Sequence, residues 1–395
     1  MQRRKIKVLR IINRFNIGGP TYNATFLSKF LSDDFETLLI GGLPEEGEYD
    51  SLHIPHSYGI VPLLIPELKR QPNFFSDRKA LKKIKEIIRE FKPDIVHTHA
   101  SKAGAIGRKA AIDCKVPVIV HTFHGHVFHS YFGSFKTHIF KFIERRLAAK
   151  TNGIIAISAL QKKELCDQYR IAPENKTTVI PLGFDLQKFQ LHQQAKRAKT
   201  RQEFGIHDDE VAIAIIGRLS PVKNHSFFID VIANLHVRTT KKIKVFIVGD
   251  GEERDSIQQK IEVLCLTAPI LFTSWINDIS SFNPGMDIIC LTSHNEGTPV
   301  SLIEAQACNV AFLSTDVGGV RDIVDDGNTG YICPPNNLEN YTDKLLELVE
   351  DENIRQKMSQ NGWSFVENKF GYQRLVKDVE IYYKNKLGEK GYIFE

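Results

Sequence analysis

Short apolar runs rich in valine and isoleucine alternate along the chain with longer segments of helical periodicity. Such runs are typical of strands buried on both faces, and their alternation with helices is typical of parallel sheets covered by helices. In the first half the pattern predicts helices near residues 20–32, 76–91, 101–113, 133–150 and 159–169. It predicts strands at residues 5–12, 35–41, 60–65, 94–99, 117–123, 153–158 and 177–181.

The second half restarts this pattern after a polar stretch rich in glutamine and lysine, residues 187–201. We predict an α/β protein of two doubly wound Rossmann-like domains, residues 1–186 and 187–371, that face each other across a cleft. Ligands of such sheets bind at the carboxyl ends of the strands, so the cleft would hold two substrates. The strands predicted for the second domain are 211–216, 243–248, 269–273, 286–291, 310–314 and 329–332.

The composition is that of an ordinary folded protein, with 42% hydrophobic and 25% charged residues in 395 positions. The net charge of +5 is mild, and no cluster of lysine and arginine marks a nucleic-acid site, so nucleic acid is excluded as a partner. No signal region and no run of about 18 apolar residues is present. We therefore predict a cytoplasmic protein that at most lies on the inner face of the cell membrane.

The six cysteines are scattered, without a Cys-x-x-Cys pair or a histidine at ligand spacing. This predicts buried free thiols and no metal site.

The run from Glu296 to Glu304 carries the most specific chemistry of the chain. We predict that Glu296 lies in a loop, that Thr298 is the N-cap and Pro299 the first residue of a helix, and that Glu304 lies two turns into that helix. Free amides at a helix start suit a diphosphate, and a carboxylate further along can accept hydrogen bonds from ribose hydroxyls. The run therefore favours a sugar nucleotide, although two solvated acids would explain the glutamates taken alone.

Arg218 and Lys223 leave one turn between a predicted strand and a helix. Both cations could reach one anion, where they would stabilise the charge that develops on a departing diphosphate and replace a metal ion. The alternative is a pair of solvated basic side chains, which the positive end of a helix disfavours.

Three histidines close one predicted strand, His121, His124 and His126, and His97 and His99 end its neighbour. Such a polar cluster suits the binding of sugar hydroxyls or the movement of protons. Zinc binding is the other sharp explanation, but no cysteine and no His-x-x-x-His spacing completes a ligand set.

Two glycine-containing turns permit close approach of a ligand to the backbone. Gly18-Gly19 precedes the first predicted helix, and Gly249 lies in a turn after the strand 243–248. A purely structural turn explains either one, because the spacing of a dinucleotide fingerprint is missing. Trp275-Ile276, after the next strand, could pack on a base, although a core tryptophan is the commoner explanation.

The helix expected at 133–150 carries an apolar stripe and many basic residues. A domain helix with its apolar face on the sheet explains the stripe. A basic amphipathic helix on an anionic membrane is the alternative. The stripe consists of Phe135, Ile139, Phe142, Ile143 and Leu147.

Taken together, these motifs resemble the family 4 retaining glycosyltransferases of the GT-B fold over nearly the whole chain. The segment from Val96 to Arg108, which includes Lys102, is similar to the branch that builds bacterial surface polysaccharides. The motifs that occur in the family's order are Gly18-Gly19, His124-Gly125, Gly217-Arg218 with Lys223, Val248 to Gly251, Glu296 to Glu304 and Val317-Gly318-Gly319.

The resemblance implies a nucleotide-sugar donor that is linked through UDP and held mainly by the second domain. It also implies a transfer that requires no metal ion. Arg218 and Lys223 would bind the diphosphate, Glu304 the ribose and Glu296 the sugar, with His124 near the donor sugar and acceptor. The acceptor would be a glycan or lipid-linked glycan on the side of His97, Lys102 and His126. The last helix, 372–395, would pack back on the first domain. The remaining donor-binding residues would be Gly18, Gly19, Gly249, Ile276, Gly297, Thr298, Pro299 and Val300.

The chain departs from the family's pattern at Ser274, where a glycine often follows the strand, and at Asn224, where glycine is common. Two other functions fit the same fold: a phosphorylase or epimerase, and a subunit that binds a nucleotide sugar without turning it over. The sugar, the acceptor and the linkage would be set by loops of the first domain, at 42–60 and 125–135.

Overall fold

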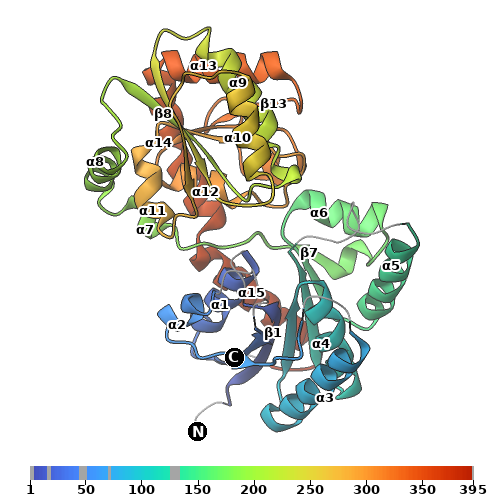
Figure 1. The fold of residues 1–395 in the computed structure, drawn as a ribbon. Coiled ribbons are helices and arrows are strands. Elements are labelled where there is room, and N and C mark those ends of the chain that lie inside the picture. Colours follow the sequence, from blue (N-terminus) through green and yellow to red (C-terminus); the bar gives the residue numbers. More distant parts are fainter. Residues whose placement is uncertain (1–3, 16–18, 44–50, 70–72, 125–133, 394–395) are drawn as a thin grey trace. The chain divides into compact units, whose positions relative to one another are not determined.

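The computed structural model describes residues 4–15, 19–43, 51–69, 73–124 and 134–393. The chain divides into two compact units: unit 1, Met1–Phe184 with Gly371–Glu395, and unit 2, Asp185–Phe370. Each unit is a parallel β-sheet covered by helices (Figure 1). The predicted α/β architecture with two such sheets is confirmed.

Unit 1 has a seven-stranded sheet in the order β3-β2-β1-β4-β5-β6-β7. Its strands are β1 (Ile6–Arg14), β2 (Phe35–Gly42), β3 (Leu63–Leu64), β4 (Ile95–His99), β5 (Val118–Phe123), β6 (Gly153–Ala156) and β7 (Thr177–Val179). Its helices are α1 (Gly19–Lys29), α2 (His53–Ser57), α3 (Phe74–Phe91), α4 (Ser101–Asp113), α5 (Ser134–Ala149), α6 (Ala159–Lys163) and α15 (Tyr372–Gly388).

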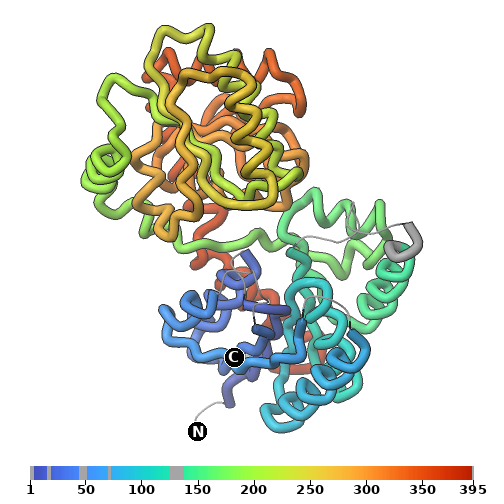
Figure 2. The backbone as a smooth tube through the Cα atoms, in the orientation of Figure 1, coloured from blue at the N-terminus to red at the C-terminus, as the bar shows by residue number. Residues whose placement is uncertain are grey.

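The two faces of this sheet are buried by different helices, because neighbouring residues of a strand point to opposite sides. Val8 of β1 packs with Leu375 and Val379 of α15. Leu9, the next residue, packs on the other face with Ile84 of α3. The backbone trace shows the C-terminal helix, in red, among the blue N-terminal segments of unit 1 (Figure 2).

Unit 2 has a six-stranded sheet in the order β10-β9-β8-β11-β12-β13. Its strands are β8 (Glu210–Ile216), β9 (Lys242–Val248), β10 (Ile270–Ser274), β11 (Ile288–Leu291), β12 (Ala311–Thr315) and β13 (Tyr331–Cys333). Its helices are α7 (Gln187–Gln190), α8 (Gln193–Glu203), α9 (His225–His236), α10 (Arg254–Val263), α11 (Ile279–Phe282), α12 (Val300–Ala307), α13 (Leu338–Glu350) and α14 (Glu352–Phe370).

The connection between the units is a double crossing of the chain. Phe184, at the end of the first passage through unit 1, forms a parallel bridge with Gly371, where the chain returns. The amide of Tyr372 donates to the carbonyl oxygen of Phe184 at 3.0 Å. The two crossings therefore leave unit 1 side by side.

Two predicted elements differ in extent from those observed. The strand expected at 60–65 is reduced to Leu63–Leu64, because Pro62 has no amide hydrogen to donate to a sheet. The helix expected at 159–169 is an α-helix only to Lys163 and continues as a π-helical turn, Glu164–Gln168.

The cysteines are free thiols, but they are not all buried. Cys290, Cys308 and Cys333 are buried as predicted, whereas Cys265 is exposed in the turn that follows α10.

Candidate active site

The loops at the carboxyl edge of the sheet in unit 2 are fastened to one another. The amide of His294, after β11, donates to the carbonyl oxygen of Val222, after β8, at 2.8 Å. The Thr292 hydroxyl donates to the carbonyl oxygen of Lys223 at 3.1 Å, and the Thr315 hydroxyl of β12 donates to that of Ser293 at 2.8 Å. Sequence reasoning missed these anchors, whose only signal is a threonine or serine at the end of an apolar strand.

This anchoring brings Lys223 and Glu296 together. The Lys223 Nζ lies 2.6 Å from the Glu296 Oε1, which also accepts a hydrogen bond from the Ser293 hydroxyl at 2.6 Å. Both charged side chains are largely buried. A partly buried pair with an added hydrogen bond is held in one geometry more firmly than a fully exposed pair.

Arg218 leaves the same turn but pairs with a different carboxylate. Its Nη2 lies 3.1 Å from the Oε2 of Glu252, and both side chains are more than half exposed. Exposed pairs of this kind contribute little to stability, because water and salt screen them. An anion of higher charge can therefore displace Glu252 at little cost.

The helix after Glu296 begins later than predicted. Helix α12 starts at Val300, and Pro299 is its N-cap, with an extended backbone of φ −71° and ψ 98° and no capping hydrogen bond from its side chain. The assignment of Thr298 as the N-cap and Pro299 as the first helical residue was therefore wrong. Glu304 consequently lies just beyond the first turn of α12, not two turns in. Gly297 is exposed, and Thr298 and Val300 are partly buried.

Glu304 is partly buried on α12. Burial raises the pKa of its carboxyl group to about 7, and the nearby positive charge of Lys188 opposes that rise. Ligand groups that donate hydrogen bonds to the ionised carboxylate would stabilise that form and lower its pKa.

Glycine is required at two positions of the site because other residues of unit 2 leave no room for a Cβ atom. A Cβ on Gly249, whose φ is +132°, would lie 2.0 Å from the carbonyl oxygen of Gly217, and one on Gly318 would lie 1.9 Å from that of Glu296. The amide of Gly319 donates to the Glu296 carbonyl oxygen at 3.0 Å. The glycines thus let neighbouring turns come into contact. The loop at Gly318-Gly319 fixes the backbone of Glu296 through this hydrogen bond.

The tryptophan after β10 is not a core residue. Trp275 is 50% exposed, which excludes the commoner explanation given above. Ile276 beside it is partly buried. Ser274 adopts a left-handed conformation with φ +54°, and its carbonyl oxygen accepts from the Gly249 amide at 2.9 Å.

His97 of unit 1 is not available to an acceptor. It is fully buried beneath α15, where its Nδ1 lies 2.5 Å from the Tyr383 hydroxyl and its Nε2 lies 2.7 Å from the Thr122 Oγ1. Both ring nitrogens are thus engaged inside the protein. The prediction of an acceptor-side role for His97 is wrong, because the C-terminal helix covers it.

The other residues predicted in unit 1 have different surroundings. His124, at the end of β5, lies with its Nε2 2.8 Å from the Nδ1 of His99. Lys102, on the first turn of α4, pairs with Asp77 of α3 at 2.7 Å. Gly19 is the first residue of α1. Gly18 and His126 lie outside the described residues.

Helix α5 turns its expected apolar stripe outward. Phe142 is 53% exposed, and Ile139 and Ile143 are exposed as well. The side that packs on unit 1 carries Phe140 and Ala148 instead. The explanation of the stripe as a sheet-facing surface is therefore wrong for these three side chains.

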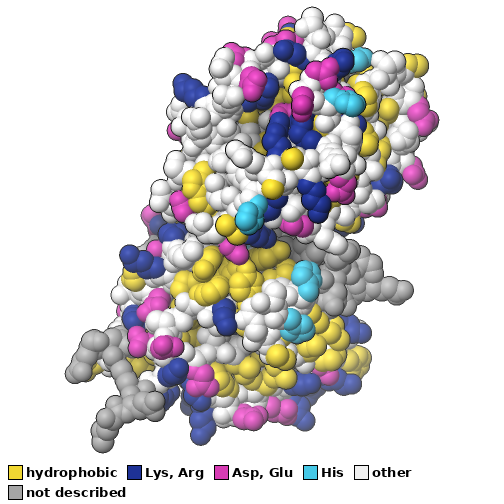
Figure 3. Space-filling view, turned by 90° about the vertical axis from the view of Figure 1, so that its left-hand side faces the viewer, with side chains coloured by type: hydrophobic (Ala, Val, Ile, Leu, Met, Phe, Trp, Pro, Cys, Tyr) yellow, Lys and Arg dark blue, Asp and Glu magenta, His cyan; other side chains and the backbone are white. Residues whose placement is uncertain are grey.

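In the part of the chain that the structure describes, no helix is long and apolar enough to cross a membrane. No group of three histidine, cysteine or acidic side chains is arranged to hold a metal ion there. On the face drawn in Figure 3, lysine and arginine side chains are interspersed with acidic ones in both units.

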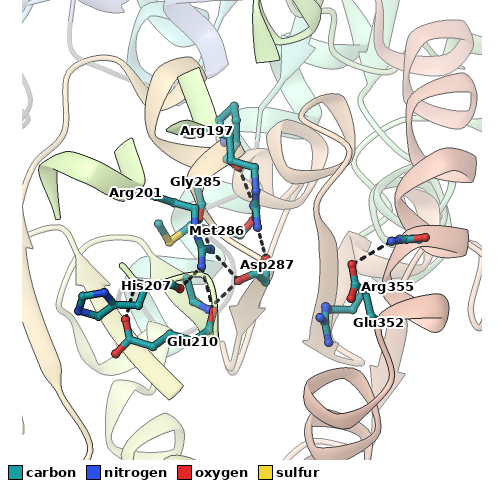
Figure 4. Close-up of polar contacts among 12 residues, drawn as sticks. Arg197, Arg201, His207, Glu210, Gly285, Met286, Asp287, Glu352 and Arg355 are labelled. Carbon is teal, nitrogen blue, oxygen red and sulfur yellow. Dashed lines mark hydrogen bonds and ion pairs between the residues drawn. The ribbon is translucent and has the colours of Figure 1, made fainter. Parts of the chain in front are cut away.

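A cavity of about 300 Å³ lies at the opposite, amino edge of the sheet in unit 2. Arg197 and Arg201 both point at Asp287, which precedes β11, and the Ala212 amide donates to the same carboxylate at 2.8 Å (Figure 4). These groups satisfy one another, so they fasten α8 to the sheet and offer no free charge to a ligand. Residues that line the cavity include Gln193, Arg197, Asp287, Asn309, Arg355 and Ser359.

Comparison with known proteins adds family and fold to this geometry. The model for "Glycosyltransferase Family 4" matches residues 18–188, and the model for "Glycosyl transferases group 1" matches residues 196–364. The capsular polysaccharide biosynthesis glycosyltransferase CapM of Staphylococcus aureus is 30% identical over 329 residues, which cover 82% of this chain and 84% of CapM.

Two further similarities concern a relative and a solved structure. The UDP-Gal:alpha-D-GlcNAc-diphosphoundecaprenol alpha-1,3-galactosyltransferase of Escherichia coli is 28% identical over 329 residues, which cover 82% of this chain and 84% of that enzyme. HepE of Anabaena, solved with UDP, superposes with a TM-score of 0.82 at 18% identity and covers 96% of this chain and 100% of its own. At this identity the structural similarity supports the fold alone.

Proposed function

The chain belongs to the family 4 glycosyltransferases of the GT-B fold, and we propose that it transfers a hexose or an N-acetylhexosamine from a UDP-linked donor to a glycan or lipid-linked glycan. The anomeric configuration would be retained. That it is a glycosyltransferase follows from the family. UDP is proposed because the E. coli relative is named for UDP-Gal and HepE was solved with UDP and with UDP-glucose.

The observation that carries the proposal is the Lys223–Glu296 pair at the carboxyl edge of the sheet in unit 2. A cation for the diphosphate and a carboxylate for the hydroxyls of a sugar lie 2.6 Å apart there. Arg218 leaves the same turn with a weakly held guanidinium. A nucleotide sugar presents both chemistries, a diphosphate and a polyol, within one molecule.

Unit 2 would bind the donor along this edge. Arg218 and Lys223 would contact the diphosphate, and the amide of Val300 at the start of α12 would add a donor. Glu304 would accept hydrogen bonds from the ribose, and the base would lie near Gly249 and Ile276. Gly297, Thr298 and Pro299 form the segment between Glu296 and α12, so they would lie beside the sugar and the phosphates.

The transfer would need no separate general base. The bond between the anomeric carbon and the β-phosphate oxygen breaks as a bond to the acceptor hydroxyl oxygen forms on the same face. The acceptor's proton then passes to the departing phosphate oxygen. Arg218 and Lys223 stabilise the negative charge on that phosphate more strongly as the bond breaks, which lowers the barrier in the manner of a metal ion.

The exposed face of helix α5 supports the proposal that the enzyme acts at a lipid surface. Ile139, Phe142 and Ile143 are exposed together, and Arg146 and Lys150 on the same helix are exposed beside them. Apolar side chains flanked by cations suit the interface of an anionic membrane. The acceptor of the E. coli relative is named as a saccharide on diphosphoundecaprenol, which is a membrane lipid. These features support our proposal that the enzyme works at the inner face of the cell membrane.

A donor screen tests this proposal. UDP-galactose, UDP-glucose and UDP-N-acetylglucosamine are compared by thermal shift, and UDP release is then followed with and without EDTA. We expect one donor to raise the melting temperature and to be consumed at the same rate in both conditions. Absence of stabilisation by every UDP-sugar would overturn the choice of nucleotide, and loss of turnover in EDTA would overturn metal independence.

A further inference from the structure

Arg10 is a fully buried cation in the middle of the sheet in unit 1. Its Nη1, which carries two hydrogens, lies 3.0 Å from the Nδ1 of His97, 3.1 Å from the Tyr383 hydroxyl and 3.4 Å from the Nε2 of His99. No carboxylate is among its hydrogen-bond partners in the described residues. Because an arginine side chain only donates hydrogen bonds, each group that it faces must present a lone pair.

The positive charge of Arg10 favours one tautomer of His99. A hydrogen on the Nε2 of His99 would point at this cation, whereas a lone pair there faces it favourably, so we assign the lone pair to Nε2. In a neutral imidazole the hydrogen must then lie on Nδ1. That Nδ1 lies 2.8 Å from the Nε2 of His124, to which it donates.

The same reasoning assigns the tautomer of His124. Since its Nε2 accepts from His99, the hydrogen of the neutral ring lies on Nδ1. The Nδ1 of His124 is buried and has no hydrogen-bond partner among the described residues. A buried donor left without an acceptor is uncommon in proteins, and the carboxyl ends of the strands in such a sheet are where ligands bind.

We propose that Arg10 and His99 are positioning residues that hold His124 as the Nδ1–H tautomer, so that His124 donates a hydrogen bond to a hydroxyl oxygen of a sugar substrate. His124 is then a hydrogen-bond donor and not a proton acceptor. The inference rests on the proposed function for the identity of the substrate, whereas the tautomer itself does not depend on it.

The surroundings keep all three rings neutral. Burial lowers the pKa of His124 to about 3 and lowers the pKa values of His97 and His99 well below the usual range. The positive charge of Arg10 acts in the same direction on His97 and His99. The three rings therefore stay neutral near neutral pH, so the tautomers assigned above do not change there.

Kinetics of His99 variants give the first test. His99→Leu removes the donor to His124, and we expect kcat for the accepted UDP-sugar to fall by about 10- to 100-fold, as for other residues that orient a reacting group. The KM for the donor should change little, since unit 2 supplies the nucleotide contacts. His99→Asn places an amide N–H near the former Nδ1 and should restore most of the rate. Val120→Ala, which opens a cavity at a fully buried residue of β5, is the control for a general loss of packing.

Nitrogen NMR of histidine-labelled protein gives the second test and needs no substrate. Spectra of the wild type and His124→Ala assign the ring, which should show a protonated Nδ1 and an unprotonated Nε2. Arg10→Met should mix the tautomers of His99 and His124.

A protonated Nε2 on wild-type His124, or full activity of His99→Leu, would overturn the inference. Failure of every UDP-sugar to bind would overturn the proposed function while leaving the NMR result to decide the tautomer.

Discussion

The Lys223 Nζ lies 2.6 Å from the Glu296 Oε1, although 73 positions separate the two residues in the chain. They meet because β8 and β11 are neighbours in the sheet of unit 2, so the loops that follow these strands share one edge. The pair is thus a product of the crossover in strand order, which is where open α/β sheets bind ligands. A diphosphate that reaches Lys223 would also lie beside Glu296.

Removal of the Lys223 ammonium group should lower the rate of transfer more than the affinity for the donor. We expect Lys223→Ala to lower kcat/KM for the UDP-sugar by about 100- to 1000-fold, because the developing charge on the phosphate loses a fixed donor. Steady-state assays of UDP release measure the effect. Lys242→Ala is the matched control, since Lys242 forms a pair of the same length with Asp209 on the surface of unit 2. Equal losses in the two variants would contradict the role given to Lys223.

Glu304 should make nucleotide binding depend on pH. Its pKa of about 7 in the free protein means that the carboxyl group is mostly protonated at pH 6 and mostly ionised at pH 8. Ribose hydroxyls donate to the ionised form and would lower that pKa on binding. The affinity for UDP should therefore rise with pH through about 7, by roughly tenfold between pH 6 and pH 8.

The Glu304→Gln variant isolates this effect from the titration of UDP itself. At pH 8 it should bind UDP about 10- to 100-fold more weakly, the value of a hydrogen bond to a charged group, and at pH 6 the two proteins should differ far less. Isothermal titration calorimetry gives both affinities. Glu350→Gln, at an exposed carboxylate of α13, is the control. A ratio of affinities that does not change with pH would rule out Glu304 as the ribose acceptor.

The sequence predicted the elements well because buried parallel strands leave a strong pattern. Every strand of both sheets was anticipated, and the main error in extent, at 60–65, arose where Pro62 interrupts pairing. The start of α12 was misplaced because Pro299 fixes φ but not ψ, and ψ decides whether a proline opens a helix or caps it. Local residue preference alone does not determine whether Pro299 is the N-cap or the first residue of the helix.

The errors at the candidate site have a different origin, since they depend on partners far away in the chain. His97 was assigned to the acceptor side from its position at the end of a strand, but α15, nearly 300 residues later, covers it with Tyr383. The outward stripe of α5 was equally hidden, because helical spacing shows that Phe142 and Ile143 share a side without showing what that side faces. Lys223 and Glu296 were each predicted, but their direct contact was not.

The outward face of α5 should bind anionic lipid. We expect the wild-type protein to sediment with vesicles of equal parts phosphatidylglycerol and phosphatidylcholine, and not with phosphatidylcholine alone. A double variant, Phe142→Gln with Ile143→Gln, should weaken binding by about tenfold or more, since each buried apolar side chain is worth about 1.5–3 kcal/mol. Because both side chains are exposed, folding should be retained.

Val263→Gln, at an exposed valine of α10 in unit 2, serves as the control for the vesicle assay. Binding to both kinds of vesicle, or unchanged binding of the double variant, would contradict an electrostatic and apolar contact through α5.

The two departures from the family's glycine pattern should respond differently to restoration of glycine. Ser274 and Asn224 both have left-handed backbones, with φ of +54° and +52°. Serine is poorly suited to that region, so Ser274→Gly should stabilise the protein by about 1 kcal/mol. Asparagine tolerates the conformation, and its Oδ1 accepts from the Phe227 amide as the N-cap of α9. Asn224→Gly should therefore change stability by only a few tenths of a kcal/mol.

Calorimetric melting of the two variants beside the wild type distinguishes these expectations. Among the described residues, the hydroxyl of Ser274 makes one long contact, of 3.5 Å, with the Arg254 Nη1. Its removal therefore costs little against the relief of backbone strain. A gain in stability from Asn224→Gly as large as that from Ser274→Gly would show that the cap contributes nothing. A loss of stability in Ser274→Gly would show that the side chain, and not the backbone, determines the residue at this position.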